Sequence, residues 1–137
     1  MSEKFKVVLT ELSRQFGTEL TAKEGIASLT FDGEHVVHLA PMGEEHVVVF
    51  MYATKLLCEL QALTLLRQNF FSPNPYMPRV GLSQDDSLIV WNQHRLNELD
   101  GEVLSQTLVY FLSYKETLSS TGASPTELAS FDSMLMV

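Results

Sequence analysis

The four histidines are the residues of this sequence best suited to bind a metal or to move a proton at neutral pH. His35 and His38 lie three residues apart in a run with strand character, where successive side chains alternate, so the two should point to opposite faces. If the next turn is centred on Gly43, His38 and His46 become diagonal neighbours across a hairpin. One diagonal pair without a third ligand is a weak site, so we predict no metal site.

The other reactive side chains give no catalytic pattern. Cys58 is the only cysteine and lies in an apolar segment, which is typical of a small buried hydrophobe, and no basic neighbour is placed to activate its thiol. The carboxylate pairs Glu44-Glu45 and Asp85-Asp86 fall in turns, as solvated loop residues do. The sequence contains no Gly-rich phosphate loop, no Gly-x-Ser-x-Gly and no CxxC motif. We therefore predict that the chain is not an enzyme and needs no cofactor.

Composition narrows the partners that the chain can have. Its 137 residues fit one domain, and its formal net charge is −8, from 9 Lys+Arg against 17 Asp+Glu. Binding to nucleic acid or to an anionic membrane surface requires clustered basic residues, so both partners are excluded. No apolar run approaches the roughly 20 residues that span a bilayer. The N-terminus does not resemble a signal peptide, and the lone cysteine fits a reducing compartment, so we expect a cytoplasmic protein.

The N-terminal half predicts one helix followed by an antiparallel meander. Apolar residues recur at spacings of three and four from Phe5 to Phe16, which predicts a helix over about 3–16 with Gly17 as its C-cap. Three strand-like runs follow at 26–31, 35–39 and 46–52, and Asp32-Gly33 between the first two is a strong signal for a tight hairpin. The third run is too apolar to be half exposed, so we interpret it as a buried or interface strand.

The segment 53–70 changes to a helical period and is apolar around almost the whole helix. One sheet face can cover only one stripe of such a helix, so it needs a second cover. In so small a domain the favoured cover is a second copy of the chain, and the alternative is a central core helix in a monomer. We predict a homodimer whose interface is formed by Leu57, Leu60, Leu63 and Leu65 of this helix.

The C-terminal half predicts two more strands and a third helix. Val80–Leu82 and the run from Leu88 to Trp91 have strand character, and Asp100 is placed to cap a helix whose apolar stripe ends at Leu118. The expected domain is therefore 1–118, and the Ser/Thr/Gly/Pro-rich segment 119–137 is predicted to be a mobile tail. The element order is α-β-β-β-α-β-β-α, which indicates an α+β fold with a twisted antiparallel sheet and three helices.

One segment resembles a known family. The run from Leu88 to Asp100, LIVWNQHRLNELD, is similar to the last strand and following turn of class I type III secretion chaperones, in particular those that serve the YopE and ExoS type of effector. The segments 66–72 and 38–50 resemble other helix and strand ends of the family, so the resemblance extends over about 5–118. Arg95 departs from the pattern, since the family usually has proline there, and the tail has no counterpart.

The resemblance implies a cytoplasmic bacterial protein that is a dimer joined largely through its second helix. Such a chaperone binds the non-globular N-terminal segment of a secreted effector and keeps it competent for secretion. The implied partners are a second copy and the effector segment, and the secretion ATPase is a further candidate. Two alternatives stay open: a regulatory protein of the same fold that sequesters a secretion regulator, and, less favoured, a small enzyme or ligand-binding domain.

The effector-binding groove is expected between the first helix and the first strand. Its candidate residues are Leu9, Leu12 and Phe16 on the helix, with Leu29 and Phe31 on the strand. An apolar groove can take an extended strand or a short amphipathic helix of a partner. A stripe that merely packs the helix on its own sheet would give the same sequence pattern, so this second interpretation stays open.

Overall fold

The computed structural model describes residues 3–17, 21–31, 34–69, 74 and 76–121. The sheet has six antiparallel strands in the order β1-β2-β3-β4-β6-β5. Within the described residues, no helix is both long enough and apolar enough to cross a membrane. In chain order the elements are α1 (Glu3–Phe16), β1 (Thr21–Lys23), β2 (Ile26–Phe31), β3 (His35–Met42), β4 (His46–Lys55), α2 (Glu59–Gln68), β5 (Arg79–Leu82), β6 (Ser87–Arg95), the 3-10 turn η1 (Leu96–Glu98) and α3 (Gly101–Thr121).

The α+β fold and its predicted element order are confirmed, with two short elements added. The sequence did not predict β1, which pairs with β2 through a two-residue turn at Glu24 and Gly25. Both turn residues have positive φ, 55° and 82°, as a tight hairpin turn of type I′ requires, and glycine adopts this conformation easily. The Glu-Gly pair before an apolar run was therefore the available signal for this hairpin.

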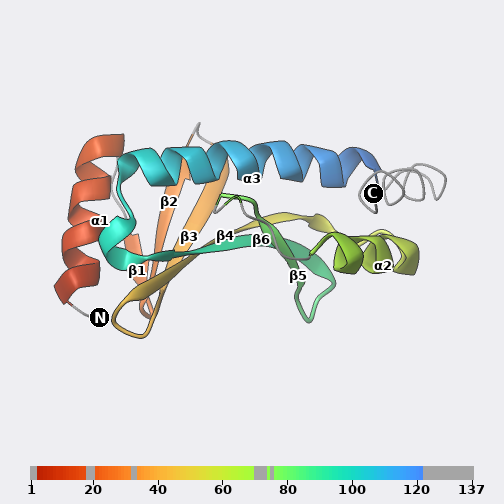
Figure 1. The fold of residues 1–137 in the computed structure, drawn as a ribbon, viewed down its shortest axis with the longest axis horizontal. Coiled ribbons are helices and arrows are strands. Elements are labelled where there is room, and N and C mark those ends of the chain that lie inside the picture. The colour runs from red at the N-terminus through yellow and green to blue at the C-terminus, as the bar shows by residue number, and fades with distance from the viewer. Residues whose placement is uncertain (1–2, 18–20, 32–33, 70–73, 75, 122–137) are drawn as a thin grey trace.

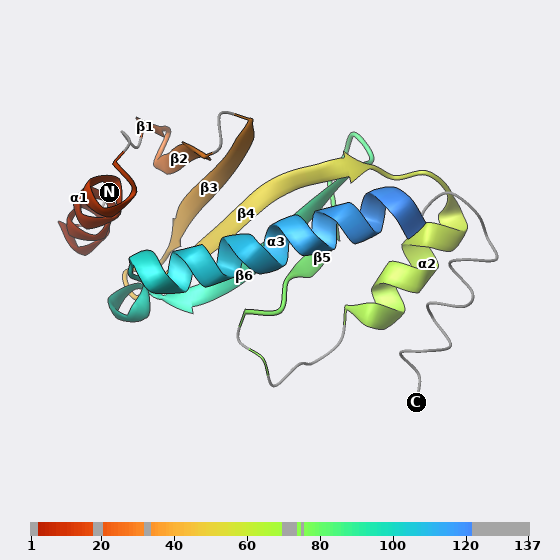
Figure 2. The ribbon, with the colours of Figure 1, turned by 90° about the horizontal axis from the view of Figure 1, so that it is seen from above.

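The helices lie at the two ends and along one side of the molecule (Figure 1). α1 and α2 lie at opposite ends, and α3 runs along one side of the sheet between them (Figure 2). No helix of the described chain covers the other side of strands β3, β4 and β6 in these views.

Strand β4 shows how the two faces of the sheet differ. Val47, Val49, Met51 and Ala53 are buried, whereas the residues between them are half-buried or, at Tyr52, exposed. This alternation is the period-two pattern of a strand with one face in the core. The outward residues Val48, Phe50 and Tyr52 are nevertheless apolar or aromatic, which explains why the segment has no sequence alternation. Within the subunit the strand is therefore not buried on both faces, and its interpretation as an interface strand stays a prediction.

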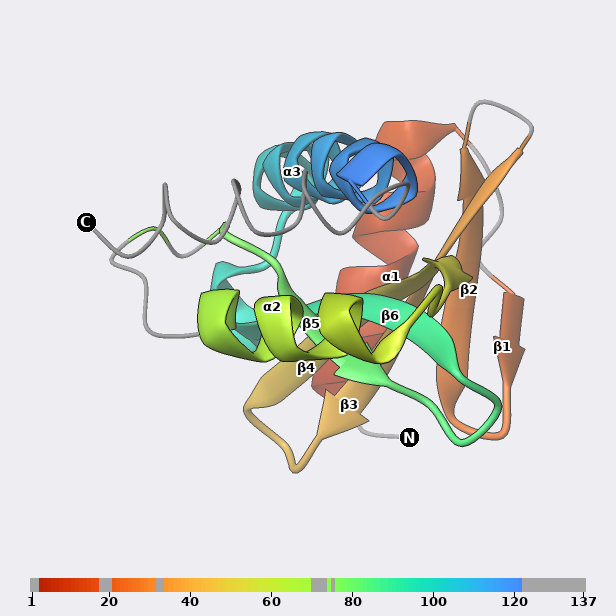
Figure 3. The same cartoon turned by 90° about the vertical axis from the view of Figure 1, so that its right-hand side faces the viewer.

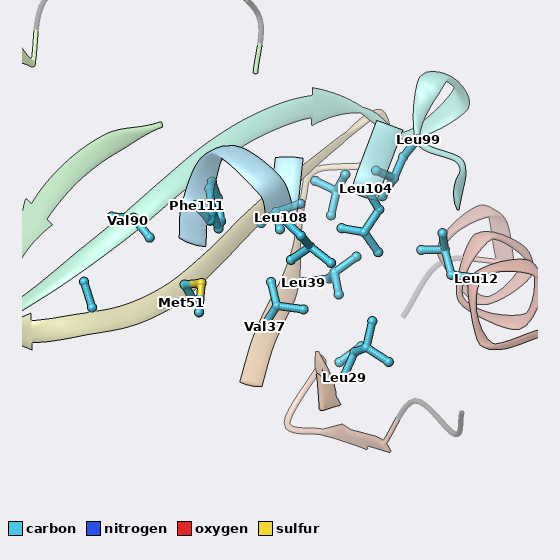
Figure 4. Packing of buried hydrophobic residues seen from close by; sticks show 14 of the residues in the cluster. Leu12, Leu29, Val37, Leu39, Met51, Val90, Leu99, Leu104, Leu108 and Phe111 are labelled. Carbon is cyan, nitrogen blue, oxygen red and sulfur yellow. The ribbon is translucent and has the colours of Figure 1, made fainter. Parts of the chain in front are cut away.

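The core lies between the inward face of the sheet and helices α1 and α3. Figure 4 shows Leu12 of α1, Leu29 of β2 and Leu104 of α3 directed into one apolar cluster. α1 begins and ends as predicted and buries Phe5, Leu9 and Leu12. The predicted cap of α3 is also present, since the backbone N–H of Val103 donates to Asp100 Oδ1 at 2.9 Å.

The second helix begins later than the sequence predicted. Strand β4 continues to Lys55, and α2 begins only at Glu59, so Leu56, Leu57 and Cys58 precede the helix. Cys58 is exposed at the N-cap, so the prediction that its thiol is buried is wrong. The helix period was assigned too early because β4 is apolar on both faces up to Ala53, and apolar residues resume at Leu56 directly after Thr54 and Lys55.

Helix α3 ends close to the predicted domain boundary. The helix continues to Thr121, three residues beyond the boundary predicted at 118. The rest of the predicted tail, residues 122–137, lies outside the described residues.

Candidate protein-binding surfaces

Helix α2 has a polar inward face and an apolar outward face. Its buried residues are Gln61, Thr64 and Leu65, so two of the three are polar. Leu63 and Leu66 on the helix are 52% and 68% exposed, and Leu57 just before it is 55% exposed. A surface helix of a monomer normally has the opposite arrangement, with its apolar stripe facing the core. The leucines of α2 are therefore placed for contact with another polypeptide.

The four interface residues predicted from the sequence do not share one environment. Leu57 and Leu63 are exposed and Leu60 is half-buried, so these three are accessible to a partner. Leu65 is only 7% exposed and belongs to the core of the subunit. Leu66 was not among the predicted residues, although it is the most exposed leucine of the helix.

A small apolar cavity adjoins this face of α2. Its volume is about 170 Å³, and it opens between α2 and the hairpin formed by β5 and β6. The lining residues are all apolar: Leu56, Ala62, Leu65, Leu66, Val80, Gly81, Leu82 and Leu88. Leu82, on the edge strand β5, is 53% exposed. We call the exposed set Leu57, Leu63, Leu66 and Leu82 the leucine surface.

The residues predicted to form the effector groove mostly pack inside the subunit. Leu9, Leu12 and Leu29 are 9%, 0% and 1% exposed and belong to the main core, as the second interpretation of this stripe expected. Phe16, at the end of α1, is half-buried and packs against the core. The side chain of Phe31 lies outside the described part of the structure. Of the five candidates, Phe16 is thus the one described side chain that is not buried.

A second apolar surface lies on the outward face of the sheet. Val36 and Tyr52 are exposed, and Val48, Phe50 and Trp91 lie half-buried on the same side. Phe50 is directly opposite Trp91 in the β4–β6 pairing. The Arg79 guanidinium of β5 lies over the Trp91 ring, 5.8 Å from its centroid, so the edge strand contributes a cation–π contact.

The strand histidines lie in packing environments. His38 Nδ1 is 2.8 Å from Ser28 Oγ, and its ring centroid is 5.1 Å from that of Phe50. Burial lowers the pKa of His38 because it disfavours the charged imidazolium. The predicted diagonal contact between His38 and His46 is wrong, since the turn is centred one residue later and pairs His46 with Met42.

His94 is the most constrained histidine and faces α3. Its Nε2 is 3.1 Å from Thr107 Oγ1, and the single hydroxyl proton of Thr107 is donated to Val103 O at 2.9 Å. Thr107 must therefore accept from His94, which places the proton of the neutral ring on Nε2. Burial lowers the pKa of His94, opposed in part by the nearby Glu98 carboxylate. Among the described residues, no three His, Cys, Asp or Glu side chains are grouped to hold a metal ion.

Comparisons with known proteins show which family and which solved structures the chain is similar to. The model of the Tir chaperone protein (CesT) family matches residues 8–119. The Yersinia pestis type III secretion chaperone SycH, solved in complex with a stable fragment of YscM2, is similar over 83% of this chain and 98% of its own, with 34% identity and a TM-score of 0.72. A comparison with curated protein sequences finds no significant match.

Two further solved structures share the fold at lower identity. A chain of the ExoT–SpcS complex from Pseudomonas aeruginosa is 23% identical over 85% of this chain and 98% of its own, with a TM-score of 0.65. A chain of the ExoU–SpcU complex from the type III secretion system of the same organism is 16% identical over 81% of this chain and 93% of its own, with a TM-score of 0.62. The family model covers most of the chain, and the chain therefore belongs to the Tir chaperone protein (CesT) family.

Proposed function

We propose that this protein is a cytoplasmic chaperone of a bacterial type III secretion system. It binds the non-globular N-terminal segment of a secreted effector and keeps that segment competent for export. The function is binding without turnover. The observation that carries the proposal is the family membership, together with a 34% identical relative that was solved with a bound fragment of another protein.

The leucine surface supports a homodimer as the working form. Leu57, Leu63, Leu66 and Leu82 are each more than half exposed, and Leu66 and Leu82 also line the apolar cavity. Large contiguous apolar surface is uncommon on a soluble monomer and indicates an interface. A two-fold dimer would use the same surface twice, so that each leucine contributes in both subunits. Leu60 would lie at the border of this interface, and Leu65 would support it from inside the subunit.

The effector segment needs apolar surface outside the dimer interface. We assign Phe16 and Phe31, at the ends of α1 and β2, as the residues of the predicted groove that contact it, and the core residues Leu9, Leu12 and Leu29 belong to the cluster against which Phe16 packs. The outward sheet face around Val36 and Tyr52 adds a second apolar region. Burial of apolar side chains in both regions would offset the entropy lost when an unfolded segment becomes ordered. The secretion ATPase stays a candidate partner.

The net charge of −8 supports a chaperone that exposes apolar surface in the cytoplasm. Mutual repulsion between highly charged molecules opposes the non-specific association that exposed leucines would otherwise cause. Specific partners then need a complementary apolar shape to overcome that repulsion.

The test is affinity capture of the tagged chain from bacteria with an active secretion system, followed by a secretion assay. The expected partner is a protein found both in the captured complex and in the culture medium, and its export should fall when the chaperone gene is deleted. Binding should map to the N-terminal segment of that protein by titration calorimetry with truncated fragments. A captured partner that is never exported would favour the regulatory alternative and contradict the proposed function.

A further inference from the structure

Hydrogen bonds of amide side chains hold helix α2 against the rest of the subunit. Its N-cap residue, Cys58, makes no side-chain capping hydrogen bond, which leaves the first turn without the usual cap. Gln61, the third residue of the helix, is 0% exposed. Its Oε1 accepts the backbone N–H of Leu57, the residue before the N-cap, at 2.9 Å, a backward contact similar to that of the Gln of a capping box, which bonds the N-cap residue itself.

The other end of the same amide reaches α3. Gln61 Nε2 donates to the backbone carbonyl of Leu118 at 3.4 Å, and Leu118 is 1% exposed. Leu118 lies in the last turn of α3, which ends at Thr121, and a carbonyl oxygen has two lone pairs, so it can accept a side-chain hydrogen bond there. A single buried side chain thus joins the chain before α2, the first turn of α2 and the last turn of α3. Figure 3 shows α2 and α3 lying one above the other at this end of the molecule.

Further side-chain hydrogen bonds hold the C-terminal end of α2. Tyr114 Oη of α3 donates to Gln68 Oε1 at 3.4 Å, and burial raises the pKa of Tyr114 to about 12, so the phenol keeps its proton. Asn69, the C-cap residue, accepts the backbone N–H of Val80 at 2.9 Å. Leu65 is the one apolar residue that α2 buries, so apolar packing does little to set the angle of the helix.

We propose that Gln61 is the positioning residue that fixes the direction in which α2 presents the leucine surface. This inference rests on the proposed dimer but concerns a residue that makes no contact across it. Hydrogen bonds are directional, whereas apolar contacts are not, so a helix held by an amide has one preferred orientation. Without Gln61 the fold would persist, because the apolar cluster that packs the sheet against α1 and α3 is made by other residues, but the leucine surface would be presented in several orientations.

The first test replaces Gln61 by methionine, which has a similar length and no amide. The matched control is Gln84→Met, an exposed glutamine in the turn between β5 and β6. We expect Gln61→Met to weaken the dimer at least ten-fold in sedimentation equilibrium and to speed amide exchange in α2 at least ten-fold. Exchange in β4 and the behaviour of the control should stay as in the unmodified chain. Unchanged dimerisation and unchanged α2 exchange would overturn the inference.

A second variant distinguishes loss of the Gln61 hydrogen bonds from simple unfolding of the subunit. In Gln61→Glu the neutral carboxyl can accept from Leu57 and donate to Leu118, whereas the ionised form cannot donate. Dimer affinity, measured relative to the unmodified chain at each pH, should therefore recover as the pH falls from 8 to 5. A variant that stays weakened by the same factor across this range would contradict a positioning role.

The two proposals fail in different ways. If the unmodified chain is a monomer at all concentrations, the proposed dimer is wrong, and amide exchange of α2 in Gln61→Met alone decides the positioning role. If the chain dimerises and Gln61→Met dimerises equally well, only the positioning role is wrong.

Discussion

Replacing Leu66 by alanine should weaken the proposed dimer without destabilising the subunit. Leu66 is 68% exposed on the leucine surface and lines the neighbouring cavity. Fully burying a leucine side chain stabilises by about 1.5–3 kcal/mol, so covering the exposed part of Leu66 is worth about 1 kcal/mol in each subunit. In a two-fold interface the same contact occurs in both subunits, so the two together contribute about 2 kcal/mol per dimer. Since about 1.4 kcal/mol corresponds to a factor of ten, the dissociation constant should rise about 30-fold.

The matched control is Val109→Ala on α3, because Val109 is 62% exposed but lies away from the leucine surface. Sedimentation equilibrium over a wide concentration range gives the dissociation constant of each variant. Urea unfolding gives subunit stability, and exposed sites usually change it by less than about 0.5 kcal/mol. If Leu66→Ala and Val109→Ala shift the dimer equilibrium equally, or neither shifts it, the assignment of the interface to α2 is refuted.

Three further predictions concern the subunit itself. Leu12→Ala should lower the free energy of unfolding by about 2–5 kcal/mol, because Leu12 is fully buried; urea unfolding would contradict this with a loss below about 1 kcal/mol. Asp100→Ala should cost about 1 kcal/mol by removing the cap of α3, whereas Asp100→Asn should cost much less; equal losses in thermal unfolding would argue against the cap. The lowered pKa of buried His94 means that the unfolded chain binds its proton more readily, so stability present at pH 7 should fall as the pH drops below the ordinary histidine range near 6.5. His94→Gln, which can still donate to Thr107, should flatten that dependence in denaturation series from pH 7.5 to 5.5, and an unchanged slope would remove His94 as its source.

Much of the fold could be predicted because local patterns and tertiary packing agree in this chain. The stripe of α1, the cap at Asp100 and the strands of the meander each follow from spacing and turn chemistry. The boundary before α2 could not be predicted from spacing. β4 is apolar on both faces up to Ala53, so it shows no strand period, and the polar pair Thr54-Lys55 at its end is short and followed at once by apolar residues.

The candidate site was less predictable. A sequence pattern shows which residues are apolar, but not which of them the subunit leaves exposed to solvent. Leu12 and Leu63 belong to similar apolar patterns, yet one is fully buried and the other 52% exposed. The polar inward face of α2 explains the difference, because Gln61 and Thr64 occupy the positions that a monomer would give to leucines. A buried glutamine in an apolar helix was the available signal.

The most direct test of the central claim is the mass of the complex with the captured effector's N-terminal segment, measured by light scattering during size-exclusion chromatography. We expect a free species of twice 15.4 kDa and a complex of two chains that holds the effector segment. A free species of 15.4 kDa that binds no exported polypeptide would contradict it.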